Sequence, residues 1–166
     1  MGSGGGPWGP CNAMLRMLGA AMLVSGCTVA PSFIPSATQP TPPGKVTQAP
    51  RERLLAFREP SEGASAVAVV TRDMGLFGAA CHYAVVINGT LAARLNSGEA
   101  AHFYLMPGEA RMKAAPDPDA TGLCSIGQGE DSSGLLVDLR ANETRHFRLH
   151  IDGRGGLHIL PDESAR

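Results

Sequence analysis

The chain has 166 residues, which suffice for one domain of ordinary size with additional segments at its ends. Its 14 Lys and Arg residues nearly balance 15 Asp and Glu residues, so we expect no broad positive field and no nucleic-acid partner. The low aromatic content of 5%, with 21 Gly and 13 Pro residues, predicts an aliphatic core and many turns rather than long helices.

Residues 1–26 have the layout of an export signal. Arg16 precedes a short apolar stretch, Met17–Val24, and small residues follow that stretch. The stretch is too short to cross a hydrocarbon core, which needs about 20 residues. We expect translation to begin at Met14, because the Gly-rich residues 1–13 fit poorly into a compact signal.

The four residues that end this signal resemble the lipobox of bacterial lipoproteins: Val24, Ser25, Gly26 and Cys27. In that family, signal peptidase recognises the first three residues, and the cysteine thiol takes up diacylglycerol and becomes the first mature residue. The resemblance implies a membrane-lipid partner, held through an acylated Cys27. Thr28 comes next, and a residue other than Asp there implies an outer-membrane location facing the periplasm. A plain signal peptide and an incidental cysteine in a buried segment are the alternatives.

Residues 27–62 are predicted to form a Pro-rich tether between the lipid and a folded domain. Their composition buries too little apolar surface to offset the entropy of ordering. Proline favours extended geometry at about 3.1 Å per residue, so we expect the domain to stand several tens of Å from the lipid. Arg51–Phe57 is compatible with one or two helical turns against the domain.

Residues 63–162 alternate apolar and polar side chains between regularly spaced turn residues. This pattern predicts an all-β domain, an antiparallel sandwich or small barrel of seven or eight short strands. The predicted strands are Ala66–Arg72, His82–Ile87, Thr90–Leu95, Glu99–Met106, Glu109–Ala115, Leu135–Leu139, Arg145–Ile151 and Leu157–Leu160. Asn88-Gly89 fits a type I′ hairpin turn. On the strand that follows this turn, Leu91, Ala93 and Leu95 are predicted to share one face.

Four segments resemble a family of small bacterial lipoprotein domains of unknown function: Val67–Arg72, Asp73–Gly78, Ile87–Gly89 and Pro107–Gly108. Members of that family are similar to the PEGA-type β-sandwiches of cell envelopes. The likeness is best over Val67–Ala115 and rests mostly on turn residues. It implies a fold and an envelope location, and it carries over no activity.

Two cysteines, Cys81 and Cys124, belong to the folded region. An even pair of thiols in an oxidising compartment predicts a disulfide, which would pin the loop Pro116–Gly134 to the sheet. The alternative is a metal or redox site, although no Cys-x-x-Cys spacing supports one.

The loop that contains Met74, Leu76 and Phe77 is apolar and flanked by glycines. We expect its side chains to plug one end of the sandwich. If they are exposed instead, they and the loop Pro116–Gly134 form the candidate binding surface, since binding residues concentrate on loops held by a rigid scaffold.

We expect no metal, cofactor or catalytic residue. His146 and His150 share a strand face but lie roughly 13 Å apart, too far for one zinc ion to bond both. Asp117 and Asp119 alternate with prolines and fit turns better than a calcium loop. These observations favour a non-enzymatic module that binds a protein or an envelope polymer. The alternative is an envelope hydrolase or metal-dependent enzyme that uses Cys, His and Asp residues of the loops.

Overall fold

The computed structural model describes residues 37–126 and 133–164. The predicted start Met14, the recognition residues Val24, Ser25 and Gly26, and the attachment residue Cys27 all lie outside these ranges. The strands of the described residues are β1 (Thr47–Gln48), β2 (Ala66–Arg72), β3 (Tyr83–Ile87), β4 (Thr90–Leu95), β5 (Glu99–Leu105), β6 (Gly108–Pro116), β7 (Leu135–Leu139), β8 (Thr144–Ile151) and β9 (Leu157–Pro161). Single 3-10 turns occur at η1 (Pro43–Lys45), η2 (Arg51–Arg53) and η3 (Gly122–Ser125).

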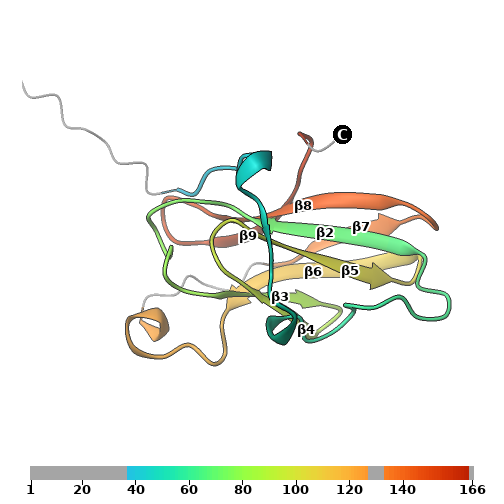
Figure 1. The fold of residues 1–166 in the computed structure, drawn as a ribbon, viewed down its shortest axis with the longest axis horizontal. Helices are drawn as coiled ribbons and strands as arrows, with labels where there is room; N and C mark the ends of the chain where they lie inside the picture. Colours follow the sequence, from blue (N-terminus) through green and yellow to red (C-terminus); the bar gives the residue numbers. More distant parts are fainter. Residues whose placement is uncertain (1–36, 127–132, 165–166) are drawn as a thin grey trace, which may run out of the picture. The chain divides into compact units, whose positions relative to one another are not determined.

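The strands form two sheets, as predicted for an all-β sandwich (Figure 1). One sheet has the order β1-β5-β2-β8-β9, and the other has the order β4-β3-β6-β7. Most neighbouring strands are antiparallel, but β1 pairs parallel with β5 and β2 pairs parallel with β8. The eight strands predicted from the sequence correspond to β2–β9, with boundaries that differ by at most one residue at either end.

The core lies between the two sheets and is mainly aliphatic. The inward positions of both sheets contribute fully buried side chains, among them Val70 and Phe147 from one sheet and Val85 and Leu95 from the other. Because side chains alternate along a strand, one face of each sheet supplies this core and the other faces outward. The composition therefore predicted the character of the core correctly.

The prediction for Leu91 was wrong. The register between β3 and β4 shifts after Val85, which pairs with Ala93, so that Val86 pairs with Leu91 and Ala92 is an extra residue. A β-bulge of this kind inverts the alternation beyond it. Leu91 is therefore half-buried on the outer face, while Ala92 and Ala93 are both buried in the core.

The described part of the predicted tether, residues 37–62, does not extend away from the domain. Backbone N–H groups of this segment donate to the sheets: Thr47 to Gly98 at 3.0 Å, Ala49 to Ala100 at 2.9 Å, and Leu55 to the carbonyl of Ala92 at 2.8 Å. The segment thus pairs with the free edges of β5 and β4, and these hydrogen bonds offset its entropy of ordering. The predicted helical turns are reduced to η2.

Candidate functional site

The predicted disulfide between Cys81 and Cys124 is present, with an S–S distance of 2.07 Å and a Cα–Cα distance of 5.4 Å. Cys81 ends the loop between β2 and β3, and Cys124 lies in η3, in the loop after β6. The bond therefore joins the β3 side of the first loop to η3 of the second, at the same end of the sandwich (Figure 1).

Large apolar side chains of these two loops face solvent. Leu76 and Phe77 are 77% and 40% exposed on the first loop, and Leu123 and Ile126 are 87% and 74% exposed on the second. The expected plug at the end of the sandwich is thus wrong for Leu76 and Phe77. We call these four residues the end surface. Met74 is half-buried, and its backbone pairs with Gln39.

Arg72 occupies the space that the plug was expected to fill. It is the last residue of β2, it points into the core, and it is 1% exposed. Its guanidinium donates to the carbonyls of Gly78 (2.6 Å), Leu95 (2.8 Å) and Cys81, and it lies 4.5 Å from the ring centroid of Tyr83. Arg72 thus ties the first loop to the end of β4.

Burial lowers the pKa of Arg72 to about 10, while the neighbouring Tyr83 and Glu99 act in the opposite direction. The guanidinium remains charged at neutral pH and serves as a structural cation for backbone oxygens. The sequence analysis missed this residue. The available signal was its phase, because Arg72 continues the inward series of Ala66, Ala68 and Val70 on β2.

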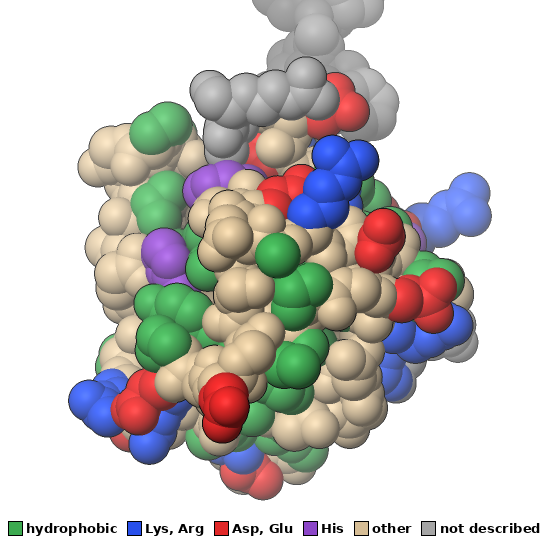
Figure 2. All heavy atoms as spheres, turned by 90° about the vertical axis from the view of Figure 1, so that its right-hand side faces the viewer, with side chains coloured by type: hydrophobic (Ala, Val, Ile, Leu, Met, Phe, Trp, Pro, Cys, Tyr) green, Lys and Arg blue, Asp and Glu red, His purple; other side chains and the backbone are tan. Residues whose placement is uncertain are grey.

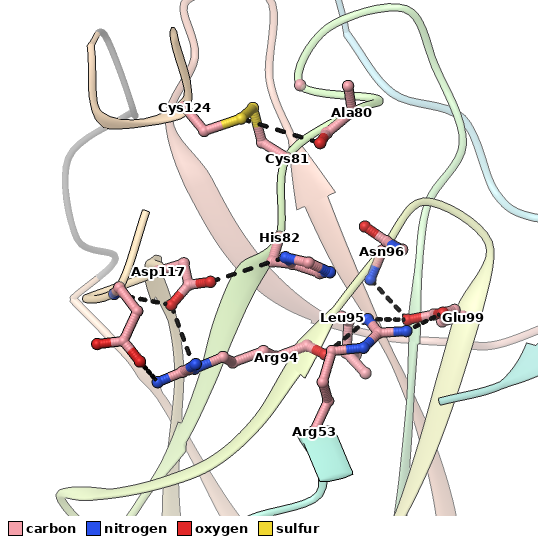
Figure 3. Close-up of polar contacts among 12 residues, drawn as sticks. Arg53, Ala80, Cys81, His82, Arg94, Leu95, Asn96, Glu99, Asp117 and Cys124 are labelled. Atoms are coloured by element: carbon pink, nitrogen blue, oxygen red, sulfur yellow. Dashed lines mark hydrogen bonds and ion pairs between the residues drawn. A yellow bond between two sulfur atoms is a disulfide. The ribbon is translucent and has the colours of Figure 1, made fainter. Parts of the chain in front are cut away.

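A polar cluster lies below the disulfide in the view of Figure 3. The Nε atom of Arg94 lies 3.2 Å from a carboxylate oxygen of the buried Asp117, and a terminal nitrogen of Arg94 contacts Asp119. The Nδ1 atom of His82 is 3.9 Å from Asp117, which is too long for a hydrogen bond. Burial and the charge of Arg53 lower the pKa of His82, which favours a neutral ring at pH 7. Both aspartates that suggested calcium are therefore paired with an arginine.

Glu99 and Arg53 form a second pair in the same view. The guanidinium donates two hydrogen bonds, of 2.7 and 2.5 Å, to the two carboxylate oxygens of Glu99. The backbone N–H of Asn96 donates a third, at 2.8 Å. Burial raises the pKa of Glu99, but these hydrogen bonds outweigh it, and the net pKa is lowered. This pair fixes η2 to the start of β5.

No family model, curated protein or solved structure matches this chain.

A third cluster surrounds Asp73, whose carboxylate is 1% exposed. Arg148 donates to both of its oxygens, at 2.9 and 2.5 Å, and the Nδ1 atom of His150 lies 3.0 Å away. The hydroxyl of Thr38 is 3.2 Å from the same Nδ1 atom. A catalytic relay requires the hydroxyl and the carboxylate to meet opposite ring nitrogens, so this geometry does not activate Thr38 as a nucleophile. The cluster instead fixes Thr38 beside the end of β8.

The histidines and cysteines of the described residues do not converge on a metal site. Cys81 is in the disulfide, His82 lies beside Asp117, and His102 lines a groove on the outer face of the five-stranded sheet. Over residues 37–126 and 133–164, no group of three His, Cys, Asp or Glu side chains is placed to hold a metal ion. The same residues contain no helix that is long and apolar enough to span a membrane.

A broader cleft of about 730 Å³ lies between the edge of β7 and the start of β8. Its lining mixes charges of both signs, including Asp138, Arg140, Glu143 and Arg145, with the apolar Leu136. Within it, Glu143 lies 4.0 Å from the guanidinium of Arg145 and accepts a hydrogen bond from the backbone N–H of Arg140 at 2.9 Å, so this carboxylate is already paired. The ion pairs described above have structural roles in the fold. The exposed apolar side chains of the end surface do not, so the end surface is the candidate functional site.

Proposed function

We propose that this chain is a lipid-anchored protein of the bacterial cell envelope and that its β-sandwich is a non-enzymatic binding module. The end surface is its working surface. One observation carries this proposal: four large apolar side chains are exposed on two loops that a disulfide joins. Exposed apolar groups on loops held by a rigid scaffold are typical of interaction sites.

The anchoring part of the proposal rests on the lipobox-like residues up to Cys27 and on the state of the other thiols. A disulfide between Cys81 and Cys124 supports an oxidising compartment, because cytosolic thiols are kept reduced. Acylation of Cys27 retains the domain at a membrane in that compartment.

The binding part is favoured over catalysis by the state of the titratable groups. The hydrolase alternative needs at least two such groups that face a reacting atom. Around the end surface, Asp117 is paired with Arg94 and Asp73 with Arg148. These pairs fix loops to strands, which is the role expected of a scaffold.

The anchor is tested on protein purified from its native membrane fraction by mass spectrometry of the N-terminal peptide. We expect a peptide that begins at Cys27 and carries acyl chains, and we expect a Cys27→Ser variant to retain its leader and to lack the acyl mass. A fatty-acid-free protein that keeps its leader in the soluble cytosolic fraction would refute the anchor.

The working surface is tested in cells with a photocrosslinking residue in place of Leu123. A matched variant carries the same residue in place of Met106, which is 63% exposed in the turn between β5 and β6 at the other end of the sandwich. We expect crosslinks to an envelope component from position 123 and not from position 106. Equal yields from both positions, or none from position 123, would contradict a working surface at this end.

A further inference from the structure

The described chain begins beside the end surface. The backbone N–H of Thr38 donates to Ile151, the last residue of β8, and Gln39 pairs with Met74 in the loop that carries Leu76. Figure 1 shows the first described residues, the β2–β3 loop and η3 at the left-hand end. The route from Cys27 to the domain therefore arrives at the end where the apolar loop tips lie.

The link between this end and the lipid is short. Residues 37–62 pack on the domain, so ten residue steps separate Cys27 from residue 37. At 3.3–3.6 Å per residue, these steps span at most about 35 Å. An acylated Cys27 consequently keeps residue 37, at the same end as the end surface, within about 35 Å of the bilayer, far less than the reach expected from a free tether of residues 27–62.

The two ends of the sandwich differ in character. The opposite end, seen in Figure 2, displays Lys, Arg, Asp and Glu side chains of both signs around small separate apolar areas. There, Arg58 and Glu59 form an exposed ion pair before β2. The end surface instead combines Leu76, Leu123 and Ile126, each about three-quarters exposed or more. Exposed aliphatic side chains of this kind can be buried at the boundary between the lipid headgroups and the acyl chains.

We propose that the end surface inserts into the same bilayer that holds the acyl chains of Cys27. This inference rests on the proposed function and names the partner of its working surface as lipid. The disulfide between Cys81 and Cys124 presents both loop tips as one unit, so they enter the interface together with little ordering entropy. The short link supplies a high effective concentration of lipid at that end, so a modest intrinsic affinity suffices.

Phe77, unlike the other three residues of the end surface, packs against a neighbouring turn of the domain. A Cβ atom built on Gly155 would lie 3.4 Å from its ring, so the glycine of the β8–β9 turn provides the space against which the ring packs. This contact supports the first loop from the side of the five-stranded sheet. Leu76, the preceding residue and the more exposed of the two, then projects from a loop that this contact supports.

The test uses an introduced tryptophan as a depth probe. The sequence contains one tryptophan, Trp8, which precedes Cys27, so the processed chain contains none. Lipidated Leu123→Trp protein is reconstituted into vesicles of phosphatidylethanolamine and phosphatidylglycerol (3:1) that contain phospholipid brominated on the acyl chains. We expect the fluorescence of this variant to be quenched at least twofold and that of a matched Met106→Trp variant to be unchanged.

A second measurement removes the anchor. The chain that begins at residue 27 and carries Cys27→Ser is mixed with the same vesicles and separated by flotation. We expect measurable binding, and we expect Leu76→Asp and Leu123→Asp each to lower the partition coefficient about tenfold, as for one inserted leucine. Met106→Asp should leave it unchanged, and circular dichroism verifies that each variant is folded.

The outcomes separate this inference from the proposed function. If position 123 is not quenched, or flotation does not depend on Leu76 and Leu123, lipid insertion is refuted. If position 123 then crosslinks to a protein in cells, the binding module stands with a protein partner instead. If native Cys27 carries no acyl chain while the vesicle results hold, the anchor is refuted and the surface itself still recognises lipid.

Discussion

Replacing Arg72 with methionine is expected to destabilise the domain more than any surface substitution. Methionine fills much of the same buried space but donates no hydrogen bond, so the carbonyls of Gly78, Cys81 and Leu95 lose a charged donor. Each such loss costs about 1–3 kcal/mol. The variant no longer buries a charge, which offsets part of the loss. We expect the free energy of unfolding to fall by about 3–5 kcal/mol.

Urea unfolding at pH 7 under non-reducing conditions measures this effect. With a slope of about 2 kcal/mol per molar urea, the midpoint should fall by about 2 M. Arg58→Met is the matched control, since Arg58 is exposed and its loss should change stability by less than about 0.5 kcal/mol. If Arg72→Met unfolded within 1 kcal/mol of the wild-type protein, the guanidinium would not be what holds the loop to β4.

Three further outcomes follow from the contacts of the sandwich. Replacing both Cys81 and Cys124 with alanine should lower the free energy of unfolding by about 4 kcal/mol, the chain-entropy value for a closed loop of 43 residues, as measured by urea unfolding. Glu99 has a lowered pKa when folded, so its contribution is present above its unfolded pKa and is lost as pH falls through the folded value. Glu99→Gln should therefore be less stable at pH 7 and flatten the acid limb of a stability–pH curve, and an unchanged limb would contradict this. Asp73→Asn should lower the free energy of unfolding by about 2 kcal/mol, because Arg148 loses a buried carboxylate, and calorimetry measures the loss.

The strands were predictable because their signals are local. Alternating side chains and turn residues identified β2–β9, and the φ values of Asn88 (49°) and Gly89 (80°) are those that a type I′ turn requires. The exception at Leu91 arises from the β-bulge after Val85, and no residue type at these positions predicts a bulge. The register depends on both paired strands, so the sequence of one strand alone does not determine it.

The packing of residues 37–62 was not predictable from composition. Its contacts use backbone donors such as those of Thr47 and Ala49, and these donors pair with strand edges that only the folded sheets create. Of the site, the disulfide and the alternative of an exposed Leu76 and Phe77 could be stated in advance. The hydrogen-bond partners of Arg72 could not, although its phase on β2 indicates an inward side chain, because all three are backbone oxygens of a loop and of another strand.

The parallel pairing of β2 with β8 has a consequence for the order in which the chain can fold. In this pairing Val67 meets Thr144, and β2 is the middle strand of its sheet, so that sheet stays incomplete until nearly the whole polypeptide has been delivered. Contacts so far apart in sequence form late and slowly. During synthesis, this topology postpones native closure of the five-stranded sheet until the C-terminal strands β8 and β9 have emerged from the ribosome.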